Sequence, residues 1–187
     1  MNSNQSVLAL ETKRLRLRSF RLEDVSIFSA YRSDPEVARY QGWNAPFNLE
    51  KATQFVEEMI QAKPGTPGQW YQIAIEVKEN DQMIGDCVFH ILEEDPLQAK
   101  IGFTLARAHQ GKGYATEAVL CLFEYLFGTL NLHRVSAICD VKNTASARVL
   151  ERAGMRREAH FIENIWFKGK WGSEYGYGIL AQEWAKR

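Results

Sequence analysis

Gln110-Gly111-Lys112-Gly113-Tyr114-Ala115 is the most informative hexapeptide of this 187-residue chain. It joins a strand-like segment, residues 99–105, to an apolar, helix-like run that ends near Phe127. Glycines let the backbone pass close to a bulky anion, and the first turn of the following helix leaves N–H groups unpaired at its positive end. The hexapeptide therefore predicts a loop that binds phosphate groups, and a simple tight turn is the alternative.

The hexapeptide differs from two common nucleotide-binding motifs. It lacks the Gly-Lys-Ser/Thr ending of a P-loop, whose hydroxyl would hold Mg²⁺. It also lacks the three glycines and the later acidic residue of the dinucleotide fingerprint. Nucleotide hydrolysis and hydride transfer are therefore disfavoured, and binding of ATP or NAD by this loop is a weaker alternative.

The hexapeptide resembles the pyrophosphate-binding loop of the GNAT superfamily, the acetyl-coenzyme A-dependent N-acetyltransferases. That loop reads Gln/Arg-x-x-Gly-x-Gly/Ala, which Gln110, Gly113 and Ala115 match. In the family, a hydrophobic strand residue five positions before the glutamine pairs its backbone with the pantetheine arm, and Leu105 stands there. The resemblance implies acetyl-coenzyme A as cosubstrate, bound by Phe103, Thr104, Leu105, Gln110, Gly111, Lys112, Gly113, Tyr114 and Ala115.

Composition limits the classes of protein to which the chain can belong. It is 45% hydrophobic and 25% charged, which suits one core and a single domain over residues 1–187. With 23 basic and 23 acidic residues, no global charge favours nucleic acid or an anionic membrane. Residues 1–6 lack the layout of a secretory signal, and no apolar run could span a bilayer, so we expect a cytoplasmic protein.

The three cysteines, Cys87, Cys121 and Cys139, are predicted to be structural. Their number is odd, they are widely spaced, and each lies in an apolar context typical of a small buried side chain. No neighbouring pattern suggests a lowered thiol pKa. We therefore expect no disulfide framework, no metal site and no covalent catalysis by cysteine.

The order of the predicted elements indicates an α+β fold. Over nearly the whole chain it is also similar to the GNAT fold, which implies a mixed, mostly antiparallel central sheet of about seven strands flanked by four helices. Periodicity and turn residues predict strands at 12–20, 70–77, 83–92, 99–105, 134–139, 161–167 and 175–180, and helices at 24–32, 49–62, 116–127 and 144–153. Asp34-Pro35 and Asn44-Ala45-Pro46 are predicted to interrupt the chain between the first two helices.

A second group of candidate residues surrounds the start of the helix predicted at 144–153. Asn143 and Ser146 suit a helix N-terminus, which is the structural interpretation. Their Asn-x-x-Ser spacing also resembles GNAT members in which the asparagine contacts pantetheine. Arg148 on the same helix is a candidate for contact with the cofactor phosphates, with an exposed charge as the alternative.

The chain resembles most closely the ribosomal-protein N-terminal acetyltransferases of the RimJ/RimL type. Their first strand reads like Thr-x-Arg-Leu-x-Leu-Arg, matched by Thr12, Arg14, Leu15, Leu17 and Arg18. Many GNAT enzymes use a tyrosine of the last helix to protonate the leaving thiolate, but Leu150 stands at that position. The resemblance implies that Ser146 takes its place, by donating a hydrogen bond to the departing sulfur.

The chemistry implied is direct attack of an unprotonated amine on the thioester carbonyl. Strand N–H groups near residues 103–105 would stabilise the developing oxyanion. Glu163 is the candidate general base because it lies on a late strand bordering the acceptor side, and a solvated glutamate is the structural interpretation. Asp86, His90 and Glu158 are its competitors.

These inferences predict an enzyme that transfers acetyl from acetyl-coenzyme A to a primary amine in a ternary complex. The amine belongs to a protein or peptide N-terminus or to a small molecule. The predicted partners are thus acetyl-coenzyme A and an amine acceptor, with no nucleic acid and no membrane, in a monomer or homodimer. A GNAT-like domain that binds coenzyme A without turnover is the alternative.

Overall fold

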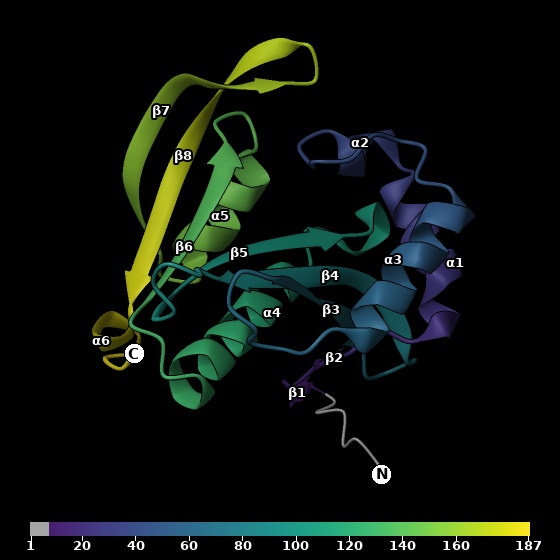
Figure 1. Ribbon diagram of the computed structural model, residues 1–187, viewed down its shortest axis with the longest axis horizontal. Coiled ribbons are helices and arrows are strands. Elements are labelled where there is room, and N and C mark those ends of the chain that lie inside the picture. Colours follow the sequence, from purple (N-terminus) through teal and green to yellow (C-terminus); the bar gives the residue numbers. More distant parts are fainter. Residues whose placement is uncertain (1–7) are drawn as a thin grey trace.

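A single β-sheet forms the centre of the computed structural model, which describes residues 8–187. Its eight strands lie in the order β1-β2-β3-β4-β5-β6-β8-β7 (Figure 1). All neighbouring strands are antiparallel except β5 and β6, which are parallel. The strands are β1 Ala9–Glu11, β2 Leu15–Arg18, β3 Trp70–Val77, β4 Gln82–Ile91, β5 Gln98–Leu105, β6 Arg134–Asp140, β7 Arg156–Phe167 and β8 Lys170–Leu180.

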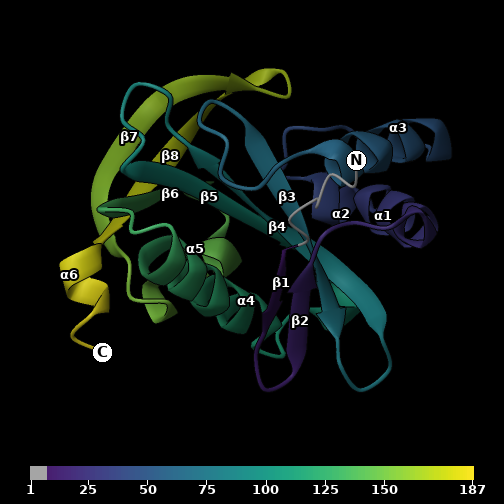
Figure 2. The same cartoon turned by 60° about the horizontal axis from the view of Figure 1, so that its bottom comes forward.

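Helices cover both faces of this sheet. Figure 2 shows α4 and α5 on one side, and α1, α2 and α3 on the other. The helices are α1 Val25–Arg32, α2 Pro35–Ala38, α3 Leu49–Gln61, α4 Tyr114–Phe123, α5 Thr144–Arg152 and α6 Ala181–Trp184. A wider, π-type helical segment, Glu124–Thr129, extends α4. The predicted α+β class and the mixed, mostly antiparallel sheet are confirmed.

The alternation of side chains along β3 explains the two cores. Ile73 and Ile75 are fully buried in the larger core, which also contains Leu122 of α4 and Leu150 of α5. Ala74 points to the opposite face and joins a smaller core with Phe28 of α1. Because successive strand residues face opposite sides, one apolar strand supplies both layers.

The structure has one strand and two helices more than the sequence predicts within residues 8–187. The strand predicted at 12–20 corresponds to β2, and the additional strand is β1, which precedes it: the chain reverses between Thr12 and Leu15 so that β1 pairs with β2. Asp34-Pro35 starts α2 rather than interrupting the chain: the Asp34 carboxylate accepts a hydrogen bond from the Glu36 N–H, and proline fits the first helical position. The third addition, α6, has four residues at the end of β8.

The β7–β8 hairpin is longer than its sequence pattern predicts. The strands begin at Arg156 and Lys170, whereas the sequence places them at 161–167 and 175–180. Most of β7 is exposed, so the additional residues carry no apolar alternation that could reveal them. At the turn, the Lys168 ammonium donates hydrogen bonds to the carbonyl oxygens of Ala38 (2.6 Å) and Trp43 (2.8 Å), which ties the hairpin to the α2 region (Figure 1).

None of the helices in residues 8–187 combines the length and the apolar composition that a membrane span requires. The interpretation of residues 1–6 as lacking a secretory signal lies outside the described residues.

Candidate functional site

The site begins where β5 and β6 separate. The two strands pair only at Gln98↔Arg134, Ala99↔Val135 and Lys100↔Ser136, although they continue to Leu105 and Asp140. Both outer neighbours, β4 and β8, stay paired with them beyond this point. A gap therefore opens inside the sheet, at the carboxyl ends of its only parallel pair within residues 8–187.

The register of β5 shows which backbone groups face the gap. Two hydrogen bonds, Leu92 N–H to Gln98 O (3.0 Å) and Ala106 N–H to Ile84 O (2.8 Å), indicate that even-numbered β5 residues bond to β4. In an antiparallel pair the intervening residues point their N–H and C=O groups the other way. The backbone groups of Phe103 and Leu105 therefore point toward the gap that β6 has left.

A cavity of about 630 Å³ lies at the open end of this gap. Its walls come from the end of β5, the loop that leads into α4, the helix α5, and the region of α2. The lining residues are Glu36, Val37, Tyr40, Gln41, Phe103, Thr104, Leu105, Arg107, Gln110, Gly111, Gly113, Tyr114, Ala115, Thr116, Asn143, Ala145, Ser146, Arg148, Val149 and Arg152. All predicted cofactor residues except Lys112 are among them.

The glycine loop has the geometry of an anion-binding loop. Gly111 and Gly113 have φ values of +75° and +81°, a region that side chains other than glycine adopt only with strain. Gly113 is the N-cap of α4, and no side chain caps that helix. The first i→i−4 bond of α4 joins the Glu117 N–H to Gly113 O (3.1 Å), so the earlier N–H groups remain for a ligand. These residues fit a diphosphate.

Gln110 and Lys112 have different environments from those of the glycines. The Gln110 side-chain amide donates to the Leu105 carbonyl oxygen (3.0 Å), so it braces the loop against the end of β5. Lys112 does not line the cavity, and its carbonyl oxygen accepts a hydrogen bond from Arg14 Nη1 (3.0 Å). The loop thus presents its glycine face to the cavity.

The N-terminal part of α5 combines a capping role with exposure to the cavity. The Asn143 Oδ1 accepts from the Ser146 N–H (3.1 Å), which is the capping interaction expected from the sequence. This bond leaves the Asn143 amide nitrogen available to a ligand. Ser146 and Arg148 line the same cavity, whereas Leu150 is buried in the core. Leu150, which stands at the sequence position of the missing tyrosine, therefore presents no group to the cavity.

Sequence reasoning missed the cavity wall formed by α2. Glu36, Val37, Tyr40 and Gln41 line it, and two polar contacts hold the segment across the cavity. Asp34 pairs with Arg107 (3.0 Å), and the Tyr40 hydroxyl donates to the Lys142 carbonyl oxygen (3.4 Å). The Asp-Pro pair could have predicted the helix, but no local pattern could have predicted that it lines the same cavity as the glycine loop.

Glu163 lies away from the cavity. It is an exposed residue of β7 with a φ of +46°, and its N–H donates to the Ser173 hydroxyl (2.9 Å). Its carboxylate is not among the groups that line the cavity. The structure therefore does not bring Glu163 into the cavity that Ser146 lines. Within residues 8–187, its carboxylate also has no hydrogen-bond or ion-pair partner.

The three competitors of Glu163 each have partners. Asp86 is buried opposite Thr104 and accepts hydrogen bonds from Tyr31 and Gln72. Glu158 is paired with Arg134, and hydrogen bonds from that residue lower the pKa of the Glu158 carboxyl. His90 stacks on Trp70, with ring centroids 4.8 Å apart. Asp86 and Glu158 are thereby committed to other contacts, whereas the buried Nδ1 of His90 has no hydrogen-bond partner among residues 8–187.

The cysteine thiols are unsuited to nucleophilic chemistry. Burial raises the pKa of Cys121 and of Cys139 to about 11, and that of Cys87 well above its usual value. Such thiols stay protonated at neutral pH. Residues 8–187 contain no cluster of three or more His, Cys, Asp or Glu side chains that could hold a metal ion.

Comparisons with known proteins agree with this geometry. A family model described as the acetyltransferase (GNAT) domain matches residues 14–156. The chain is 34% identical over 176 residues to the uncharacterized N-acetyltransferase p20 of Bacillus licheniformis, an alignment that covers 94% of this chain and 98% of p20.

Solved structures show the same architecture. The crystal structure of a GNAT-family acetyltransferase from Bacillus anthracis matches with a TM-score of 0.84 and 31% identity, covering 94% of this chain and 99% of that one. The spermidine N-acetyltransferase of Vibrio cholerae, solved in complex with CoA and spermine, matches with a TM-score of 0.78 and 19% identity, covering 93% and 99%. At that identity the second likeness supports the fold alone.

Gly113→Ala tests the conformation of the loop. A side chain at a φ of +81° costs about 1–2 kcal/mol, which the loop relieves by moving its N–H groups. We expect the Kd for coenzyme A, measured by titration calorimetry, to rise about five- to thirtyfold. Gly128→Ala is the matched control, because its Cβ would meet open space at a residue without positive φ. Equal affinities for both folded variants would contradict the assignment of the loop.

Proposed function

The chain belongs to the GNAT acetyltransferase family and is an acetyl-coenzyme A-dependent N-acetyltransferase, and we propose that it acetylates a primary amine by direct attack in a ternary complex. The observation that carries this proposal is the separation of β5 from β6 beside an uncapped helix N-terminus. The first feature leaves strand N–H groups for an amide-containing arm, and the second leaves loop N–H groups for a diphosphate.

The chain's residues would hold acetyl-coenzyme A along the length of the cavity. The N–H groups of residues 111–115 would bind the diphosphate, and Arg148 of α5 would add a cation beside it. Within residues 103–105, the backbone groups of Phe103 and Leu105 that face the gap would pair with the pantetheine arm, as would the amide nitrogen of Asn143. Lys112 would contribute charge from outside the cavity wall. Bound in this way, the cosubstrate supplies an activated acetyl thioester.

The proposed chemistry uses few protein groups. A strand N–H from residues 103–105 donates a hydrogen bond to the carbonyl oxygen on which negative charge develops. Ser146, which lines the cavity, donates a hydrogen bond to the departing sulfur. Glu163 receives the proton of the acceptor ammonium, through water because its carboxylate lies away from the cavity. No bond forms between the acetyl group and the protein.

The acceptor remains a primary amine of one of two kinds. The Thr12-to-Arg18 segment supports placement in the RimJ/RimL-like branch, and therefore a protein or peptide N-terminus. A small amine is the other acceptor class. We further propose that residues 1–187 act as one domain, in the cytoplasm, as a monomer or homodimer without nucleic acid or membrane. Family membership favours turnover over the alternative of a coenzyme A sensor.

A turnover assay tests the proposed function. We expect thiol release from acetyl-coenzyme A in the presence of one class of amine, among N-terminal peptides, polyamines, amino acids and aminoglycosides. Mass spectrometry of the product should show one added acetyl group on the amine. Coenzyme A binding without turnover on any of these classes would support the sensor instead.

Ser146→Ala tests the role of the serine hydroxyl. Removing a hydrogen bond made to the leaving sulfur should lower kcat about 10- to 100-fold while the calorimetric Kd for coenzyme A stays unchanged. Thr144→Ala, two residues earlier at the exposed start of the same helix and outside the cavity lining, is the control and should keep wild-type kcat. A kcat equal in both variants would remove Ser146 from the mechanism.

Glu163→Gln tests the general base. Loss of the base should lower kcat/KM about 100-fold near neutral pH and remove the ascending limb of its pH profile. Asp86→Asn and Glu158→Gln, measured in the same way, are the comparison variants. If the limb survives in Glu163→Gln and disappears in one of the others, that other residue is the base.

A further inference from the structure

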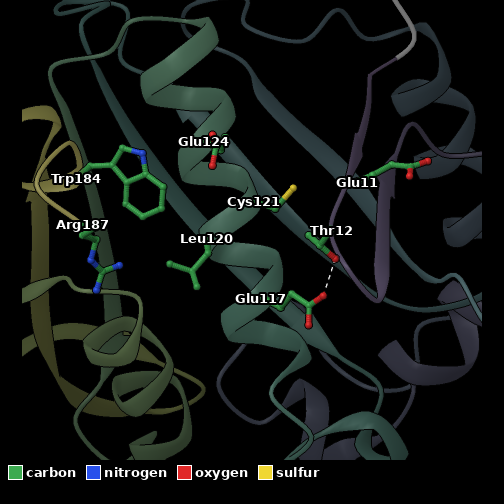
Figure 3. Close-up of a pocket in the computed structure, with 8 residues that line it drawn as sticks. All are labelled: Glu11, Thr12, Glu117, Leu120, Cys121, Glu124, Trp184 and Arg187. Carbon is green, nitrogen blue, oxygen red and sulfur yellow. Dashed lines mark hydrogen bonds between the residues drawn. The ribbon is translucent and has the colours of Figure 1, made fainter.

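Two residues of the β1–β2 hairpin contact the glycine loop and the first turn of α4. Thr12 Oγ1 donates to Glu117 Oε1 (2.6 Å), 105 positions later in the sequence. Figure 3 shows this bond at the end of the hairpin, with Glu117 projecting from α4 toward Thr12. These residues belong to the Thr-x-Arg segment, which resembles the first strand of the RimJ/RimL type. That resemblance gives the segment no physical role.

Arg14 binds Glu117 through several atoms. Its backbone N–H donates to Oε1 (3.0 Å), and its Nε and Nη2 both lie 2.6 Å from Oε2. Burial alone would raise the pKa of Glu117, but the hydrogen bonds from Thr12 and Arg14 bring it below its usual value. Glu117 is therefore an anion at neutral pH, within one turn of the helix end where a diphosphate would bind.

The same guanidinium also contacts the glycine loop. Arg14 Nη1 donates to the Lys112 carbonyl oxygen (3.0 Å), and its Cζ lies 4.5 Å from the centre of the Tyr114 ring. A Cβ added to Gly113 would lie 3.4 Å from Nη2. One side chain thus contacts or borders three consecutive residues of the loop.

The bond to Lys112 fixes the direction of the next N–H group. In a trans peptide the C=O of one residue and the N–H of the following residue point in opposite directions. Because the Lys112 C=O points to Arg14, the Gly113 N–H points away from Arg14. Gly113 lines the cavity, so this N–H is directed to the side on which an anion would lie.

The ion pair with Glu117 has an electrostatic consequence. An unpaired carboxylate in the first turn of α4 would repel a diphosphate at the same helix end. The Arg14 guanidinium balances this charge from the side opposite the cavity. Since the Arg14 side chain is 43% exposed, its contribution to the core is small compared with its contacts to the loop.

We propose that Arg14 is a positioning residue for the diphosphate of coenzyme A: it orients the Lys112–Gly113 peptide and neutralises Glu117. This inference rests on the diphosphate site of the proposed function. Arg14 touches no substrate in this arrangement, and it acts through the loop.

The test compares coenzyme A with a ligand that lacks its diphosphate and the attached 3′-phosphoadenosine. Titration calorimetry measures the Kd of coenzyme A and that of pantetheine, which lacks the diphosphate, for wild type, Arg14→Met, Glu117→Gln and the double variant. We expect Arg14→Met to raise the Kd of coenzyme A about 10- to 30-fold and to leave that of pantetheine unchanged. Glu117→Gln should change the Kd of coenzyme A less than threefold, and the double variant should regain part of the affinity that Arg14→Met loses.

Arg156→Met is the matched control. Arg156 is also 43% exposed and pairs with two carboxylates, Glu158 and Glu183, but it lies on β7 and does not line the cavity. It should bind both ligands with wild-type affinity. Arg14→Lys, which keeps the charge without the forked contacts, should fall between wild type and Arg14→Met, and it preserves the test if Arg14→Met does not fold.

The outcomes separate the inference from the proposed function. Unchanged coenzyme A affinity in folded Arg14 variants would overturn the inference and leave the function intact. Equal losses for coenzyme A and pantetheine would show a general structural role and overturn it too, and a double variant no better than Arg14→Met would refute the charge-balancing part. If wild type binds coenzyme A no more tightly than pantetheine, the diphosphate site itself is wrong.

Discussion

The early separation of β5 and β6 is the constraint on which the rest of the site depends. β5 is paired along its length with β4, and β6 is paired along its length with β8, so the sheet consists of two halves joined by three residue pairs. Backbone N–H and C=O groups that no neighbouring strand pairs still require hydrogen-bond partners. At Phe103 and Leu105 those partners must come from outside the sheet. One of them is already supplied, because the Gln110 amide holds the Leu105 carbonyl oxygen.

Polar contacts from distant parts of the chain bridge the open end of the two half-sheets. Asp34 reaches Arg107 after β5, whereas Tyr40 reaches Lys142 after β6, so the α2 segment contacts both halves. Lys168 adds a third contact from the β7–β8 hairpin. Exposed contacts of this kind contribute about 0–1 kcal/mol each. Burial anchors both walls as well: Val37 of α2 lies in the smaller core, and Ala147 and Leu150 of α5 lie in the larger one.

Local signals predicted the parts of the fold that local physics determines. The glycine loop, the β3–β4–β5 meander and the Asn143 cap follow from turn residues, alternation and side-chain hydrogen bonding to the backbone, each within a few residues. The position of α2 in the wall of the cavity and the extension of β7 could not be predicted in this way. The first depends on contacts between segments more than 60 positions apart, such as Asp34 with Arg107, and the second lacks burial and hence periodicity. Lys112 could not be placed from local sequence either, because its carbonyl group is held by Arg14 of the first hairpin.

Arg14 shows why the glycine loop cannot be understood from its own hexapeptide. A glycine loop followed by a helix offers N–H groups, but Glu117 in the first turn opposes any anion bound there. A hairpin 103 positions earlier in the chain brings a guanidinium to that carboxylate, and in our proposal this balances the opposing charge. The same guanidinium holds the Lys112 carbonyl oxygen, so charge balance and loop orientation depend on one side chain. The role that we propose for the Thr-x-Arg segment therefore follows from its contacts in space, because the first hairpin packs directly against the glycine loop and α4.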